Sequence, residues 1–124
     1  MKIAIVNKFF FLKGGQETVA LEQMRLLQEA GHQVAFFSMW HPQNPVGYEW
    51  ERFFVDYADF SLKESKPGLL QKLALAGRFV NNSQAAERFN AFLEAFKPDV
   101  IHCHGIAHQL TYSILSVARR FNIP

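Results

Sequence analysis

The sequence predicts an α/β fold, namely a Rossmann-like, doubly wound parallel sheet that is incomplete at its C-terminal end. An apolar run at residues 2–7 precedes a glycine pair and a helical pattern, which is typical of the strand, turn and helix that open such a sheet. Further apolar runs at residues 34–39 and 99–104 alternate with helical patterns, which favours parallel strands joined by helices. The 124 residues, 49% hydrophobic and 19% charged, suffice for one globular core.

The first half of the chain predicts a strand, a helix and a second strand. Residues 2–7 are expected to form the central strand, and residues 16–30 a helix that Gly31 ends. Gln23 is the one polar residue on the apolar side of this helix. Residues 34–39 are too continuously apolar for a half-exposed strand, and residues 53–55 are a candidate for a short edge strand. The apolar side of the helix consists of Val19, Ala20, Met24, Leu26, Leu27 and Ala30.

Two helices are predicted before the third strand. The pattern at residues 69–80 is apolar on several sides and carries basic residues. This helix either contacts an anionic membrane surface or packs against other parts of the protein, and its poor one-sidedness favours packing. The second helix has a narrow apolar face, and Pro98 ends it. That face consists of Ala85, Ala86, Phe89, Phe92, Leu93 and Phe96.

The last part of the chain predicts a buried strand at residues 99–104, a turn at 105–107 and a one-sided helix up to Phe121. Ile123 and Pro124 then resemble the lead-in to another strand, as Pro98 does before the third. That strand would cover the outer edge of strand 99–104. Without it the edge is open, so we expect the 124-residue chain to self-associate.

Composition excludes several classes of protein. A formal net charge of +2 without blocks of like charge does not indicate a nucleic-acid-binding protein. Cys103 is the only cysteine, so an internal disulfide is impossible and a reducing compartment is favoured. The sequence shows neither a secretory leader nor a membrane span. We therefore expect the chain in the cytoplasm.

Candidate functional residues gather where the strands end. Gly14 and Gly15 precede a helix whose free N–H groups favour an anion such as a phosphate, although the pair could equally be a tight turn only. His102 and His104 share one side of a strand, and His104 stands at the ligand-binding edge, whereas His102 is expected to be buried and hydrogen-bonded. Cys103 should face the other way, so a metal site is not favoured.

Other α/β classes fit the residues poorly. The turn has neither the G-x-G-x-x-G pattern of dinucleotide-binding proteins nor the G-x-x-x-x-G-K pattern of a P-loop. Asn7 and Lys8 stand where a signalling receiver needs an acidic cluster.

In combination, the G-G-x-E sequence at residues 14–17 and P-D-V-x-H-x-H at residues 98–104 resemble the N-terminal domain of a family 4 glycosyltransferase of GT-B fold. The resemblance covers nearly the whole chain, and residues 108–110 resemble the H-Q-L segment found in one version of the family. It implies a retaining, metal-independent enzyme without a cofactor, which moves a sugar from a nucleotide-sugar donor to a glycan or glycolipid acceptor.

The resemblance also assigns roles to residues. Gly14, Gly15 and Glu17 match the loop that approaches the donor phosphate, and His104 matches the histidine that faces the reacting sugar. The remaining substrate contacts fall to Lys13, His108 and Gln109.

Residues 1–124 would then be a partial acceptor-side domain, because the glutamate pair of the family's donor domain, E-x-x-x-x-x-x-x-E, does not occur. We expect the fragment alone to be inactive. The resemblance implies a role in the biosynthesis of polysaccharide or glycolipid. The expected location is the cytoplasm, and the alternative is a peripheral position on the inner face of the membrane. The alternative is a Rossmann-like binding module without catalysis. The sugar, the nucleotide and the acceptor are not specified by these residues.

Overall fold

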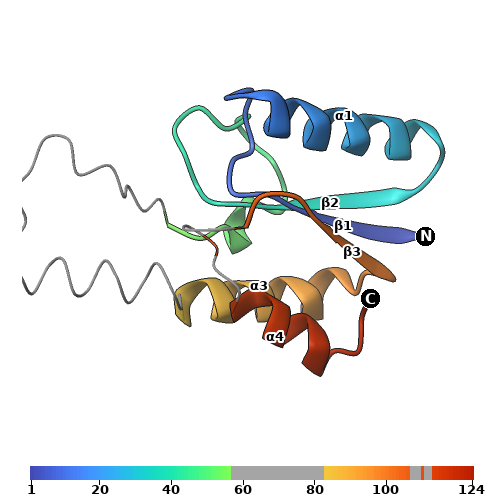
Figure 1. The fold of residues 1–124 in the computed structure, drawn as a ribbon, viewed down its shortest axis with the longest axis vertical. Coiled ribbons are helices and arrows are strands. Elements are labelled where there is room, and N and C mark those ends of the chain that lie inside the picture. Colours follow the sequence, from blue (N-terminus) through green and yellow to red (C-terminus); the bar gives the residue numbers. More distant parts are fainter. Residues whose placement is uncertain (57–82, 107–109, 111–112) are drawn as a thin grey trace, which may run out of the picture.

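The computed structural model describes residues 1–56, 83–106, 110 and 113–124 (Figure 1). The helix predicted at residues 69–80 and the candidate residues His108 and Gln109 lie outside the described residues. The described elements are β1 (Lys2–Val6), α1 (Gly15–Glu29), β2 (Gln33–Phe37), the short 3-10 helix η1 (Glu51–Phe53), α3 (Ser83–Phe96), β3 (Val100–Cys103) and α4 (Ser113–Arg120).

The three strands form a parallel sheet in the order β2-β1-β3, which confirms the predicted α/β class and the central place of the first strand. Ile5 is paired with Phe36 on one side and with His102 on the other. Because all three strands run in the same direction, their carboxyl ends meet at one edge of the sheet, where the turn before α1 also lies.

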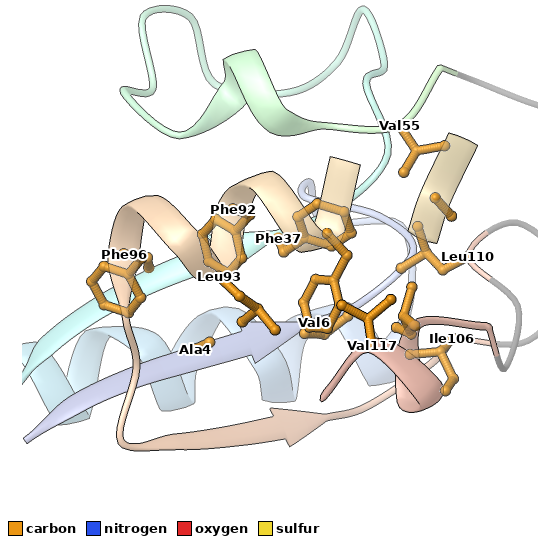
Figure 2. Close-up of a cluster of buried hydrophobic side chains, with 14 residues drawn as sticks. Ala4, Val6, Phe37, Val55, Phe92, Leu93, Phe96, Ile106, Leu110 and Val117 are labelled. Carbon is orange, nitrogen blue, oxygen red and sulfur yellow. The ribbon is translucent and has the colours of Figure 1, made fainter. Parts of the chain in front are cut away.

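Helices cover both faces of the sheet, α1 on one and the pair α3 and α4 on the other (Figure 1). The core between the sheet and α3/α4 is rich in aromatic rings: Phe37 lies 4.9 Å from Phe89 and 5.4 Å from Phe92 between ring centroids. Figure 2 shows these side chains pointing from the strands and helices toward one another. The predicted apolar face of the helix at residues 85–96 is confirmed, since all its members are buried except Ala86, which is partly buried.

The expected apolar face of α1 is partly wrong. Ala20 is fully buried and Met24 and Leu27 pack beside it, but Val19 is 59% exposed and Leu26 is 51% exposed. At about 100° per residue, Val19 and Leu26 lie roughly 100–120° around the helix from Ala20, which takes them off the sheet. The expected residue Ala30 is also exposed.

Gly31 ends α1 as predicted. Its φ is 91°, in the region that favours glycine. The N–H of Gly31 donates to the carbonyl of Gln28, and the N–H of His32 donates to that of Leu27, which is the hydrogen-bond pattern of a Schellman motif.

The candidate edge strand at residues 53–55 is reduced to a single bridge. Phe53 ends the helix η1, and only Val55 pairs with the second strand's continuation, at Met39. Outside the other edge of the sheet, the N–H of Ile101 donates to the carbonyl of Pro124 at 2.8 Å, so the chain after α4 returns alongside β3.

Candidate functional site

Asn7 connects three segments at the carboxyl edge of the sheet. It is fully buried at the end of β1, and its Nδ2 donates to the carbonyl of Phe9 (2.9 Å) and to Oε1 of Glu17 (3.3 Å). The N–H of Gly105 donates to Asn7 Oδ1 at 2.9 Å. One amide thus joins the turn after β1, the first turn of α1 and the exit from β3. The sequence pattern did not predict this role of Asn7. The feature that could have indicated it is a polar residue directly after an apolar strand.

Glu17 points into the protein. Its side chain is buried, with Oε1 on Asn7 and Oε2 3.4 Å from the position that a Cβ on Gly14 would occupy. The carboxylate therefore shapes the turn from inside. Its predicted contact with a donor stays a prediction.

The start of α1 is open. Gly14 is the N-cap residue, in an extended conformation with no side-chain cap, and Thr18 donates to its carbonyl through both its N–H and its Oγ1. A Cβ on Gly15 would meet no atom of the described residues within 4 Å, and the φ of Gly15 is not positive. Within the described part of the chain, neither packing nor backbone strain requires glycine at position 15, and no described atom fills the space beside it.

Gly105 occupies a much tighter place. A Cβ there would lie 2.3 Å from Oε1 of Gln16 and 3.0 Å from Oδ1 of Asn7, so a side chain at this position would displace Gln16 and press on the buried Asn7. Its carbonyl accepts a hydrogen bond from the N–H of Lys8 at 2.8 Å. Gly105 and Asn7 together hold the end of β3 against the glycine turn.

His104 and His102 lie on the α1 side of β3. Nε2 of His104 is 2.7 Å from Oε1 of Gln23, and Nδ1 of His102 is 3.0 Å from Nε2 of the same amide. The two imidazole rings are parallel within 2°, with centroids 4.6 Å apart. Partial burial, and after it the neighbouring His102, lowers the pKa of His104.

The prediction that His102 is buried is wrong, because its side chain is exposed. In the described sheet β3 is the outer strand, and α1 packs on residues of β1 and β2, which leaves the ring of His102 covered mainly by Gln23 and His104. Its expected hydrogen bond is nevertheless present, on Gln23.

Cys103 faces away from the histidines, as the alternation of a strand requires. It packs against the α3/α4 core, and burial raises the pKa of its thiol. The described residues contain no group of three or more His, Cys, Asp and Glu side chains that could hold a metal ion.

Lys13 is exposed on the rim of the glycine turn. Its Nζ lies 3.9 Å above the ring of Phe9, which contacts Phe11 with a centroid distance of 5.3 Å. Phe11 in turn lies 4.4 Å from His41, in the loop after β2. The loops after β1 and β2 thus form one aromatic rim beside a cation. None of the helices that the structure describes has the length and apolarity needed to cross a membrane.

The site's predicted residues are therefore only partly brought together. Gly14, Gly15 and Glu17 meet the exit of β3 around Asn7, and Lys13 flanks them. His104 lies at the same carboxyl edge, where its backbone N–H donates to the carbonyl of Val6 at 2.8 Å.

Comparison with known proteins gives one finding. A family model described as Glycosyltransferase Family 4 matches residues 13–124, which include the glycine pair, Gln23, His102 and His104. Neither a curated protein nor a solved structure matches the chain.

Proposed function

The chain belongs to Glycosyltransferase Family 4, and from that premise we propose that it forms the acceptor side of the cleft in a retaining glycosyltransferase. The enzyme transfers a sugar from a nucleotide-sugar donor to a glycan or glycolipid acceptor, without a metal ion. A donor-binding domain supplies the other wall of the cleft, so residues 1–124 alone are inactive.

The observation that carries this proposal is the meeting of three segments at one sheet edge. Asn7 ties the first turn of α1 to the exit of β3, so an open helix start and a polar imidazole stand at the same edge. A transferase needs both: a place for the phosphates of the donor, and polar groups that orient the hydroxyls of the sugars.

Donor phosphate is assigned to the turn of Gly14 and Gly15. The first N–H groups of an α-helix lack partners within the helix and, with the helix dipole, favour an anion. The free space above Gly15 admits a phosphate close to the backbone. Lys13, exposed beside this turn, adds a positive charge on the same rim.

His104 acts in the cleft by hydrogen bonding and not as a nucleophile. Its lowered pKa keeps the ring neutral near pH 7, which suits a group that orients hydroxyls. The acceptor lies against the partly exposed rings of Phe11 and His41, which the buried ring of Phe9 supports, since sugar rings and lipid chains both present apolar surface to aromatic side chains. The enzyme works in the cytoplasm, where a lipid-linked acceptor would bring it to the membrane surface.

The chain joined to its donor-binding domain tests the proposal. It is incubated with a panel of nucleotide sugars and a lipid extract, and release of the nucleotide and the anomeric configuration of the product are measured. We expect release from one nucleotide sugar, retention of configuration and no loss of activity with EDTA. Gly15→Val should weaken donor binding strongly in a folded protein, whereas Gln28→Leu, an exposed position near the other end of α1, should not.

Donor affinity that is unchanged in Gly15→Val would refute the phosphate assignment. Absence of transfer with every donor, together with binding of a ligand that is not a nucleotide sugar, would favour the binding module instead.

A further inference from the structure

Gln23 is the residue that links α1 to the histidines of β3. It is half-buried on α1, and its amide reaches across 79 and 81 positions of sequence to His102 and His104. The sequence pattern identified Gln23 only as the one polar residue on the apolar side of the first helix. In the structure it is the common partner of both imidazole rings.

The chemistry of an amide makes these two contacts unequal. The oxygen of a glutamine side chain only accepts hydrogen bonds, and its nitrogen only donates them. In the orientation that the Gln23 amide has in the structure, its Oε1 faces Nε2 of His104, and this nitrogen then carries the hydrogen. Nε2 of Gln23 faces Nδ1 of His102, so that nitrogen must be bare.

We propose that Gln23 is a positioning residue that holds His104 as the neutral Nε2–H tautomer, so that its bare Nδ1 accepts a hydrogen bond from a substrate hydroxyl. The proposal rests on the proposed function in taking the substrate to be a sugar. None of the hydrogen bonds among the described residues uses Nδ1 of His104. This tautomer selects hydroxyl groups, because an ionised phosphate offers only acceptors and gains nothing from a bare nitrogen.

The stacked ring of His102 strengthens the arrangement. With the rings parallel and 4.6 Å apart, His104 cannot turn without losing contact with its neighbour. Two protonated imidazoles at this distance would repel each other, which also favours the neutral form. Gln23 thus sets the tautomer of His104 through its hydrogen bond to Nε2. His102 holds the plane of the ring by stacking and disfavours its protonation by charge.

Long-range ¹H–¹⁵N correlation spectra of the ¹⁵N-labelled chain test this directly, because they identify which ring nitrogen carries the hydrogen. We expect His104 as a single Nε2–H tautomer and His102 with a bare Nδ1. Gln23→Leu should abolish this preference and give a mixture of tautomers at His104. In Gln23→Glu the carboxylate can only accept, so His102 should change to the Nδ1–H tautomer. The pKa of His104 should then rise by at least about one pH unit.

The control is Gln28→Leu, on the same helix but exposed and away from the histidines, which should leave both tautomers unchanged. An Nδ1–H tautomer of His104 in the unmodified chain would overturn the proposal, and this measurement needs no variant to fold. Tautomers that are unchanged in a folded Gln23→Leu protein would also overturn it. None of these spectra measures sugar transfer. The predicted tautomers, together with absence of transfer when the chain is joined to its donor-binding domain, would therefore refute the proposed function and leave this proposal standing.

Discussion

Replacing Asn7 by aspartate would place a second carboxylate beside the buried carboxylate of Glu17. The Asn7 side chain now donates to Glu17 Oε1 at 3.3 Å and to the carbonyl of Phe9. Aspartate keeps the acceptor for the N–H of Gly105 but puts an oxygen where both donations arise. The change is nearly isosteric, so it tests hydrogen bonding and charge without creating a cavity.

The magnitude follows from these contacts. Two lost hydrogen bonds cost about 2 kcal/mol. Two unit charges 3.3 Å apart repel by about 5 kcal/mol at an effective dielectric constant near 20. Uptake of a proton by the carboxylate pair limits this repulsion. We therefore expect Asn7→Asp to lower the free energy of unfolding by about 3–5 kcal/mol at pH 7, a large part of the stability of a small domain.

The sign of the pH dependence is fixed by the same repulsion. The introduced carboxyl would have a higher pKa in the folded chain than in the unfolded chain, so the folded state binds more protons as pH falls. The deficit relative to the unmodified protein should thus be full above the folded pKa and shrink as the pH is lowered through it. Urea unfolding followed by circular dichroism at pH 7.5 and pH 5 measures it.

Two further variants complete the test. Glu17→Gln in the Asn7→Asp background removes one charge and should recover about half of the loss, which a double-mutant cycle separates from the single effects. Asn90→Asp is the matched control, because Asn90 also donates to a glutamate, Glu94, but at an exposed site of α3. Its cost should stay below about 0.5 kcal/mol. Equal losses at both pH values, or no coupling to Glu17, would refute the reasoning.

Four further outcomes are expected. His104→Ala should reduce turnover about a hundredfold, whereas His102→Ala, at an exposed side chain, should change the unfolding free energy by less than about 1 kcal/mol; the reverse pattern would move the catalytic contact to His102. The pKa of His104 is lowered in the folded protein, so His104 should reduce the stability of the fold only as the pH falls below the ordinary imidazole pKa near 6.5. An NMR titration of His104 measures this pKa; His102 is the titratable group that faces the ring, and Gln23 is its neutral neighbour. Gly105→Ala should cost about 1–3 kcal/mol in urea unfolding, because Gln16 can swing away but buried Asn7 cannot, and an unchanged midpoint would show that the turn adapts freely. The chain alone should self-associate through the outer edge of β3, where the described part of the chain bonds one outward backbone group, the N–H of Ile101, to the carbonyl of Pro124. A monomer at high micromolar concentration in sedimentation would show that this contact is enough to protect the edge.

The sequence by itself determined the order of the strands β1, β2 and β3 and of the helices α1, α3 and α4. Local periodicity was enough, because a period of two or of 3.6 residues reports which side of an element is buried wherever that side meets a continuous core. It predicted the central first strand, the apolar face of α3 and the glycine that ends α1, and it placed His104 at the carboxyl edge of the sheet.

Tertiary structure alone decided how the site is held together. Periodicity gives a direction for each side chain but not the distant residue that it meets, and the partners of Asn7 and Gln23 depend on the register of β1 with β3 and on the placing of α1 over the sheet. The exposure of His102 depends likewise on what covers β3, and no property of residues 99–104 encodes that cover. Side-chain direction is a local quantity, whereas burial and hydrogen-bond partners belong to the assembled layers.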